Sequence, residues 1–273
     1  MAHYRFHKMH GLGNDFVIFD CRTDDLTLSA DQVRALADRH RGIGCDQLVV
    51  MRAPDRPESG ADLAMQIFNH DGSEVSACGN ATRCVVALAG RDVVIETGAG
   101  LLRGSLGDGA VTIDMGAPGL DWDAIPLAYP MDTAHMPVGW EDLTDPSAVS
   151  MGNPHVIFFV EDQSAVDLAR LGPLIENDPL FPERVNVNVA KIAEDAIAQD
   201  GIHLRVWERG TGLTLACGTG ACATAVAAIR RKLVTGPVPV HLPGGTLIID
   251  WQPGGTVSMT GPTSHVFTGE IDL

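Results

Sequence analysis

The sequence predicts a mixed α/β (α+β) protein built from two duplicated domains, each with several strands and one central apolar helix. Three observations support this. A Cys-Gly pair opens a stretch of small residues at Cys78 and again at Cys217. Sliding the chain by 139 residues, the difference between those positions, aligns four separate blocks without a gap. Apolar, β-branched runs of strand length precede each Cys-Gly pair.

The elements of the first half follow in order from local patterns. Residues 16–20 (FVIFD) read as a strand. A helix is expected over 29–41, because Ser29 is an N-cap residue type, Val33, Leu36 and Ala37 have helical spacing, and Gly42 is a stop signal. Strands follow at 47–51 and 65–69, with a turn after Asn69. After the Cys78 helix come three short strands at 93–97, 101–106 and 110–115.

The second half repeats these elements. GNDFVIF (13–19) aligns with GNPHVIF (152–158), DQLVV (46–50) with VNVNV (185–189), and MQIFN (65–69) with LRVWE (204–208). A helix is expected within 164–178. Further on, 100–116 resembles 245–261, where the offset has grown to 145 residues. The predicted domains are residues 1–117 plus 263–273, and residues 118–262.

Composition narrows the class of function. The 273 residues are 45% hydrophobic, enough for one large core or two ordinary ones. A formal charge of −16 without a Lys/Arg-rich block argues against nucleic-acid and anionic-membrane partners. No signal-peptide pattern and no apolar run of about 18 residues are present, so a cytoplasmic protein is expected. The six cysteines are expected to be reduced, and their spacings do not fit a zinc site.

The duplicated Cys-Gly pairs carry the chemistry. A cysteine at a helix N-terminus lies at the positive end of the helix dipole, which is expected to lower the thiol pKa. A carboxylate or a developing oxyanion can bind the N–H groups of Gly79 and Asn80, or of Gly218 and Thr219. The alternative is that both cysteines are buried core thiols beside a glycine turn.

Two related thiols suit one reaction in particular. A thiolate can remove a proton from one face of a stereocentre while a thiol delivers a proton to the other face. The sequence has no GxGxxG fingerprint, no lysine context for pyridoxal phosphate and no metal-binding histidine motif. The prediction is therefore an isomerase that needs no cofactor and no metal.

The chain resembles the diaminopimelate epimerases over nearly its whole length. The blocks that carry the resemblance are HGLGNDFVIFD, GCDQ, IFNHDGSEVSACGNATRC, ETGAG, MGNPH, ERVNV and RVWERGTGLTLACGTGACA. The resemblance implies a two-base epimerase that interconverts LL- and meso-2,6-diaminopimelate, on the route to lysine and peptidoglycan. It also implies two pseudo-symmetric domains, each a mostly antiparallel sheet or barrel around a central helix, often in a homodimer.

The resemblance also implies roles for individual residues. Cys78 and Cys217 match the catalytic thiols, and Gly79, Asn80, Gly218 and Thr219 match the backbone cradles of the reacting carboxylate. The remaining substrate-binding positions are Asn14, Gln47, Asn69, Asn153, Asn186, Glu208 and Arg209. Arg209 suits the distal carboxylate of diaminopimelate, and Glu208 suits its ammonium. His155 is either an assisting residue or a partly buried structural histidine. Asn188, outside the matched positions, is interpreted as a turn former or strand cap.

Some positions depart from the family pattern. Ala81 stands where a glycine is common, Gly98 where an arginine is common, and Phe267 where a tyrosine is often found at the dimer contact. Two alternatives stay open. A proline or hydroxyproline racemase would use the same thiol pair, although a ring amino acid has no second zwitterion for Glu208 and Arg209. A dithiol redox protein would cycle Cys78 and Cys217 through a disulfide, although no CxxC pair is present.

Overall fold

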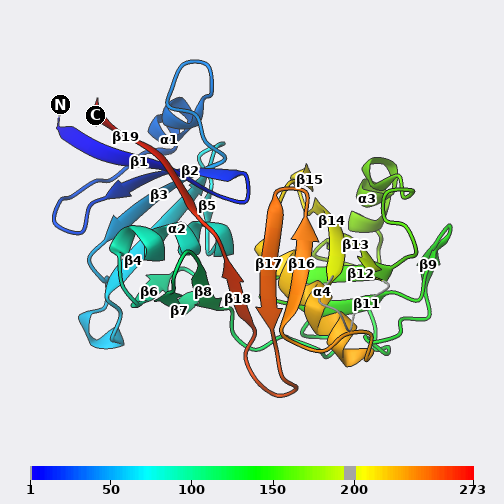
Figure 1. Ribbon diagram of the computed structural model, residues 1–273. Helices are drawn as coiled ribbons and strands as arrows, with labels where there is room; N and C mark the ends of the chain where they lie inside the picture. The colour runs from blue at the N-terminus through cyan, green and yellow to red at the C-terminus, as the bar shows by residue number, and fades with distance from the viewer. Residues whose placement is uncertain (1, 194–200) are drawn as a thin grey trace. The chain divides into compact units, whose positions relative to one another are not determined.

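The computed structural model describes residues 2–193 and 201–273, which form two compact units (Figure 1). Unit 1 comprises residues up to Asp114 together with Thr260–Leu273, and unit 2 comprises Met115–Met259. The boundaries therefore lie at 114/115 and 259/260, against 117/118 and 262/263 expected from the sequence. Within the described ranges, no helix is long and apolar enough to cross a membrane.

Unit 1 is a mixed sheet with two α-helices. Its α-helices are α1 (Ala30–Ala37) and α2 (Gly79–Ala89), and a short 3-10 turn, η1, covers Pro57–Ser59. Its strands are β1 (His3–Gly11), β2 (Asn14–Asp20), β3 (Gln47–Arg52), β4 (Leu63–Asn69), β5 (Glu74–Val75), β6 (Val93–Thr97), β7 (Gly100–Leu106), β8 (Val111–Asp114) and β19 (Ser264–Asp272).

Unit 2 has the same kinds of element. Its α-helices are α3 (Leu168–Glu176) and α4 (Gly218–Arg230). Its strands are β9 (Gly139–Trp140), β10 (Leu143–Thr144), β11 (Ser147–Ser150), β12 (Pro154–Phe159), β13 (Asn186–Ile192), β14 (Ile202–Glu208), β15 (Gly212–Thr214), β16 (Val238–Leu242) and β17 (Gly245–Asp250), and β18 (Ser258–Gly261) leads back to unit 1.

The two units share one connectivity. In unit 1, β2 pairs in parallel with β3, β3 pairs antiparallel with β4, and β6 lies parallel to β4 and antiparallel to β7. In unit 2, the strands β12, β13, β14, β16 and β17 repeat these pairings in the same order and with the same directions. The predicted fold class is confirmed.

The strand registers repeat as well. Phe16 lies opposite Gln47 in unit 1, and His155 lies opposite Asn186 in unit 2, each shifted by 139 residues. Later in the chain Val93 lies opposite Gly104 and Val238 opposite Ile249, each shifted by 145. A slip of one residue would turn every side chain to the other face of a strand. The shared register therefore puts matched residues on matched faces.

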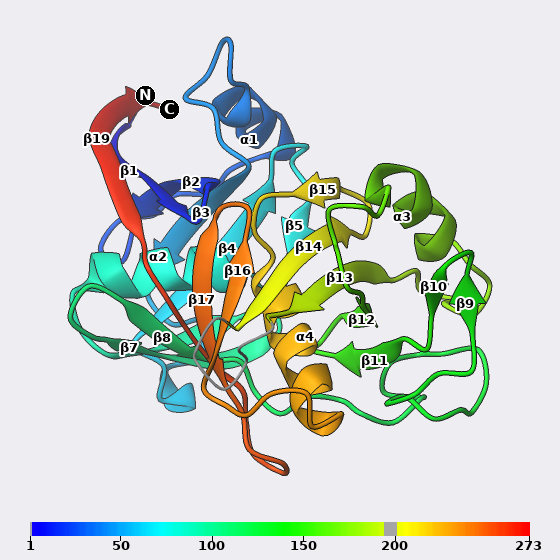
Figure 2. The ribbon, with the colours of Figure 1, turned by 45° about the vertical axis from the view of Figure 1, so that its right-hand side comes forward.

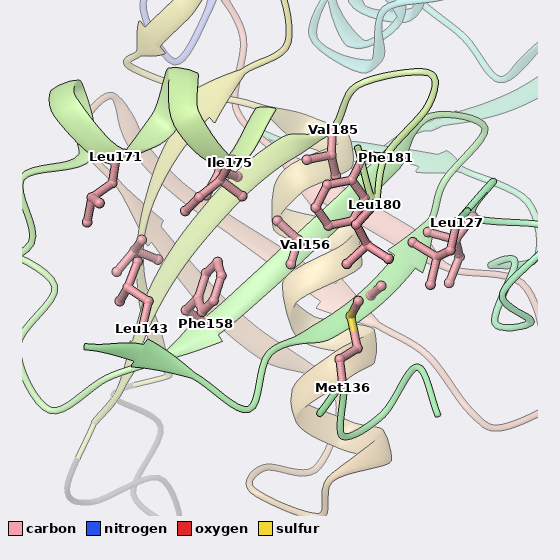
Figure 3. Packing of buried hydrophobic residues seen from close by; sticks show 14 of the residues in the cluster. Leu127, Met136, Leu143, Val156, Phe158, Leu171, Ile175, Leu180, Phe181 and Val185 are labelled. Carbon is pink, nitrogen blue, oxygen red and sulfur yellow. The ribbon is translucent and has the colours of Figure 1, made fainter. Parts of the chain in front are cut away.

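Local sequence explains the two outer helices. In α1, the Ser29 side chain accepts from the Gln32 N–H while the Gln32 side chain accepts from the Ser29 N–H, which is a capping box. In α3, Asp167 caps the Arg170 N–H, so the helix begins later than the sequence pattern alone indicates. Both helices lie between the first two parallel strands of their unit, and α3 covers an apolar core (Figure 3).

The central helix of each unit is apolar and mostly buried. Helix α2 contacts β1, β2, β7 and β8, and α4 contacts strands from β11 to β17. Figure 2 shows α4 beside the strands of unit 2. A helix that is hydrophobic on nearly all sides is stable only inside a core. Its N-terminus is therefore held rigidly, and in each unit that N-terminus follows a cysteine.

Candidate active site

Cys78 is the residue that precedes α2. Its backbone is extended (φ −147°, ψ 115°), and its carbonyl accepts from the Thr82 N–H at 2.9 Å and from the Thr82 hydroxyl at 2.8 Å. The thiol is half-buried and makes no side-chain cap hydrogen bond. The first N–H groups of a helix have no acceptor within the helix. Those of Gly79 and Asn80 are therefore the donors that the predicted cradle needs.

Asn14 lies beside Cys78, with its Oδ1 3.9 Å from the Cys78 Sγ. The same oxygen accepts from Asn80 Nδ2 at 3.2 Å, and Asn14 Nδ2 donates to Asp46 Oδ2 at 3.1 Å. Asn80 is in turn held by the fully buried Arg83, whose guanidinium donates to Asn80 Oδ1 at 2.9 Å. Each amide is thus fixed in orientation by a charged neighbour.

An ion-pair network that the sequence did not reveal supports Asn14 from behind. Asp15 pairs with Lys8 and Arg39, and Arg39 also donates to Asp46 at 2.7 Å. Burial acts to raise the pKa of Asp15, but the hydrogen bonds and charges of Arg39 and Lys8 outweigh it, and the pKa lies well below its ordinary value. Asp46 therefore keeps a fixed position from which it accepts from Asn14.

Gln47 and Asn69 form a second amide pair in unit 1, at the facing ends of β3 and β4. Gln47 Nε2 donates to Asn69 Oδ1 at 3.0 Å, and Asn69 Nδ2 donates to Ser73 Oγ at 3.1 Å. Gln47 Oε1 is buried and has no hydrogen-bond partner among the described residues. A buried amide oxygen without a partner is costly, so it suits a donor supplied by a ligand.

Cys217 precedes α4 in the same way, with an extended backbone (φ −128°, ψ 109°). It is only 4% exposed, and its Sγ lies 3.5 Å from the Thr219 hydroxyl. Glu208 reaches the thiol from the end of β14 and hydrogen-bonds with it. Gly218 and Thr219 supply the first helical N–H groups of α4. The sequence did not predict the contact between Glu208 and Cys217.

The pKa of Cys217 corrects an expectation from the sequence. Burial raises this pKa well above its ordinary value, and the nearby Glu208 carboxylate adds to the rise. The helix dipole acts in the opposite direction and does not prevail. Burial also raises the pKa of Glu208, more than its hydrogen bonds with Thr214 and Cys217 lower it. In the free protein Cys217 is therefore a thiol at neutral pH.

Asn153 and His155 lie next to this thiol. Asn153 Nδ2 donates to the Thr219 hydroxyl at 3.4 Å, and Asn153 Oδ1 lies 3.0 Å from His155 Nε2. His155 is fully buried in β12, where burial, followed by the charge of Arg209, lowers its pKa to about 3. The imidazole is therefore neutral across the physiological range.

Asn188 contradicts its interpretation as a turn former or strand cap. It lies in the middle of β13, fully buried, and its Nδ2 lies 3.2 Å from His155 Nδ1. The signal in the sequence was the alternation NVNV, which places Asn188 on the same strand face as Asn186.

Asn186 and Arg209 form the remaining group in unit 2. Asn186 Nδ2 donates to the Pro154 carbonyl at 2.9 Å, and its Oδ1 accepts from the Arg209 N–H at 3.0 Å. One guanidinium nitrogen of Arg209 donates to the Glu183 carbonyl at 2.7 Å. A guanidinium has five N–H donors, so this contact orients the side chain and leaves capacity for a carboxylate.

The other four cysteines differ from this pair. Cys21, Cys45, Cys84 and Cys222 are buried thiols. Burial raises the pKa to about 11 for Cys21 and Cys45 and to about 12 for Cys84. Across residues 2–193 and 201–273, no three His, Cys, Asp or Glu side chains gather in a way that could hold a metal ion.

Known proteins resemble the chain in both sequence and fold. A protein of Rhizorhabdus wittichii named diaminopimelate epimerase is 62% identical over 98% of this chain and 96% of its own length. One of Zymomonas mobilis with the same name is 55% identical over 98% and 97%. A hydroxyproline epimerase structure from Agrobacterium vitis, 15% identical, covers 99% of this chain and 91% of its own with a TM-score of 0.65, which supports the fold alone.

The fold is also that of a Bacillus anthracis phenazine biosynthesis protein of the PhzF family, which matches with a TM-score of 0.69 at 15% identity over the full length of both chains. The sequence profile described as diaminopimelate epimerase matches residues 6–120 and 147–266, well over half of the chain. The chain therefore belongs to the diaminopimelate epimerase family.

Proposed function

We propose that the chain interconverts LL- and meso-2,6-diaminopimelate without a cofactor, by two-base proton transfer between Cys78 and Cys217. The family and the names of its similar relatives support the substrate. The observation that carries the mechanism is the matched pair of cysteines, each of which precedes the buried central helix of its unit. The reaction belongs to the synthesis of lysine and peptidoglycan precursors.

Protons balance in this scheme. The thiolate of one cysteine takes the α-proton and becomes a thiol, and the α-carbon gains carbanion character. The thiol of the other cysteine gives its proton to the opposite face of that carbon and becomes a thiolate. The configuration inverts, and the two cysteines have exchanged protonation states. Because the reaction is reversible, each cysteine serves as base in one direction and as acid in the other.

The helix N-termini stabilise the charge that develops. As the α-proton leaves, the neighbouring carboxylate gains enolate character, which the N–H groups of Gly79, Asn80, Gly218 and Thr219 are proposed to stabilise. Preorganised donors of this kind contribute several kcal/mol in other enzymes, about 2.7–4 kcal/mol for one donor. The side chains of Asn14 and Asn153 are proposed to contact the same end of the substrate.

The distal end of diaminopimelate is proposed to bind Arg209 through its carboxylate, with Gln47, Asn69 and Asn186 among the amide contacts. Gln47 supports this with its unpartnered buried oxygen, which suits the ammonium of a substrate. The hydrogen bond between Glu208 and Cys217 supports a role at the reacting carbon instead of the distal ammonium. We propose that Glu208 receives the proton of Cys217 when this thiol must act as the base.

Incubation with LL-diaminopimelate in D2O tests this function. The protein is expected to produce the meso isomer and to introduce deuterium at one α-carbon, as read by chiral chromatography and mass spectrometry. L-Proline and trans-4-hydroxy-L-proline in parallel incubations are expected to remain unlabelled. Labelling of either ring amino acid with none in diaminopimelate would favour the racemase alternative, and labelling of no substrate would favour a redox role for the thiols.

A homodimer in the cytoplasm completes the proposal. Val266 and Phe267 lie on β19 of unit 1 and are 56% and 45% exposed, and Phe267 packs edge-on against Phe6. Adjacent exposed apolar side chains on a strand suit a protein interface. Sedimentation analysis is expected to give twice the mass of the chain, and Val266→Lys is expected to shift the protein towards monomer. A wild-type monomer at micromolar concentration would contradict this part.

A further inference from the structure

We infer that Asn188 is a positioning residue, which fixes the tautomer of His155 and thereby the direction of the Asn153 amide beside Cys217. The contacts run within unit 2, from the core strand β13 to the start of α4. The hydrogen-bond assignment stands on geometry alone, whereas its effect on turnover rests on the proposed epimerase function.

The orientation of the Asn188 amide is settled by two backbone carbonyls. Its Nδ2 lies 3.1 Å from the Val156 oxygen and 3.3 Å from the Asn186 oxygen. Carbonyl oxygens only accept hydrogen bonds, so the nitrogen of the amide, not its oxygen, must point toward them. The same nitrogen lies 3.2 Å from His155 Nδ1. Because the Asn188 side chain is fully buried, water does not offer an alternative arrangement.

The protonation of His155 follows from that orientation. Facing an N–H donor, Nδ1 must accept, so it carries no proton. Full burial disfavours the imidazolium form, which leaves the neutral tautomer with its proton on Nε2. That Nε2–H points at Asn153 Oδ1, 3.0 Å away. Asn188 therefore determines which ring nitrogen of His155 is the donor.

The Asn153 amide is fixed in turn. Since its oxygen accepts from His155, its nitrogen faces the Thr219 hydroxyl at 3.4 Å, and that hydroxyl lies 3.5 Å from the Cys217 sulfur. The opposite tautomer of His155 would present a bare Nε2 to the Asn153 oxygen. To recover a hydrogen bond, the amide would have to flip and turn its oxygen toward Thr219 and away from the donor arrangement.

The fold makes room for this arrangement in unit 2. A Cβ on Gly220, in the first turn of α4, would lie 2.7 Å from Asn188 Oδ1, so only glycine allows the amide its position. Shifting by 139 residues gives the counterparts in unit 1, where Phe16 replaces His155, Val49 replaces Asn188 and Ala81 replaces Gly220. All three features of the arrangement are thus absent together from the matched positions of unit 1.

Nitrogen-15 NMR of the labelled protein tests the hydrogen-bond assignment without reference to activity. Long-range proton–nitrogen correlations distinguish the two tautomers, and the His155→Gln spectrum identifies the signals of this ring. The wild-type ring is expected to carry its proton on Nε2 and to stay neutral from pH 5 to 9. A wild-type ring with its proton on Nδ1, or an imidazolium at neutral pH, would overturn the inference even if no variant folded.

Asn188→Leu tests the consequence, because leucine fills the volume of the amide and donates nothing. The Nδ1–H tautomer is expected to become populated, and kcat/KM for diaminopimelate is expected to fall by about 10- to 100-fold, the scale of a small misplacement at a reacting site. Val189→Ala is the matched control, since Val189 is buried on the opposite face of the same strand. It is expected to lower stability while keeping the wild-type tautomer.

The outcomes separate the two claims. A wild-type protein that does not epimerise diaminopimelate would remove the proposed function and leave the tautomer measurement intact. An active wild type, together with an Asn188→Leu variant that keeps both the wild-type tautomer and kcat/KM within about threefold, would overturn the inference alone.

Discussion

The two units give their matched cysteines different surroundings. Cys217 is 4% exposed and hydrogen-bonds with Glu208, whereas Cys78 is half-buried, and the position that matches Glu208 in unit 1 is the neutral Asn69. A carboxylate beside a buried thiol opposes loss of its proton. The duplication kept the helix N-terminus in both units and changed the charge beside the thiol. The comparison suggests that Cys217 rests as the proton donor, so that Cys78 acts first as the base.

The strongest test of the comparison removes each thiol in turn. Cys78→Ala and Cys217→Ala are each expected to lower the epimerisation rate by about 10²- to 10⁴-fold, because inversion requires proton transfer on both faces. Both variants are expected to unfold at temperatures near that of the wild type. Cys21→Ala and Cys45→Ala, at buried thiols outside the site, serve as controls that keep activity. Substantial epimerisation by either single variant would rule out the two-base scheme.

Arg209→Met tests the part of unit 2 that reads the distal group. Loss of a charge-assisted contact to the carboxylate is expected to cost about 2–4 kcal/mol in transition-state binding. That corresponds to a fall of roughly 30- to 1000-fold in kcat/KM. Because remote binding energy helps orient the reacting carbon, kcat is expected to fall as well. Steady-state kinetics within about threefold of wild type would mean that Arg209 does not bind the distal carboxylate.

Glu208→Gln tests the electrostatic difference between the thiols. The Glu208 carboxylate adds to the rise in the pKa of Cys217, so its removal is expected to lower that pKa. At a fixed pH between 7 and 9 more thiolate then exists, and iodoacetamide is expected to alkylate Cys217 about tenfold faster for each unit that the pKa falls. Peptide mass spectrometry measures the rates, with Cys78 in the same sample as the internal reference. An unchanged or slower Cys217 rate would contradict the comparison.

A pair of exchanges between glycine and alanine gives the smallest expected effects. Gly220→Ala would set a Cβ 2.7 Å from Asn188 Oδ1 and 3.3 Å from Cys217 Sγ, and activity is expected to fall on the order of tenfold. The matched change in unit 1, Ala81→Gly, is expected to cost about 0.5–1 kcal/mol of stability with little effect on kcat. Urea unfolding and steady-state kinetics measure both. Equal effects of the two exchanges on activity would contradict the difference between the units.

Sequence patterns predicted the features that depend on local order along the chain. The repeat offset foretold the strand registers, because pairing follows from which residues alternate on a strand face. The positions of Cys78 and Cys217 before their helices followed from the Cys-Gly pattern. These features needed no knowledge of where side chains point.

Features that depend on contacts between distant side chains were missed. The pairing of Asp15 with Lys8 and Arg39 joins separate strands and loops, and charged residues at such spacing are usual on any protein surface. The sequence assigned Glu208 to the distal ammonium, and only the pairing of β14 with β15 brings it to Cys217. The buried position of Asn188 depends on the parallel register of β12 and β13.

The isotope content of substrate and product at low conversion tests the two-base scheme most directly. LL-diaminopimelate is incubated in D2O, and the reaction is stopped before about a tenth of it has reacted. If Cys78 removes the proton and Cys217, already exchanged with solvent, delivers a deuteron, the meso product carries deuterium at the inverted carbon while the remaining LL substrate stays unlabelled. Product that retains the original protium would show that one group serves both faces, and would contradict the scheme.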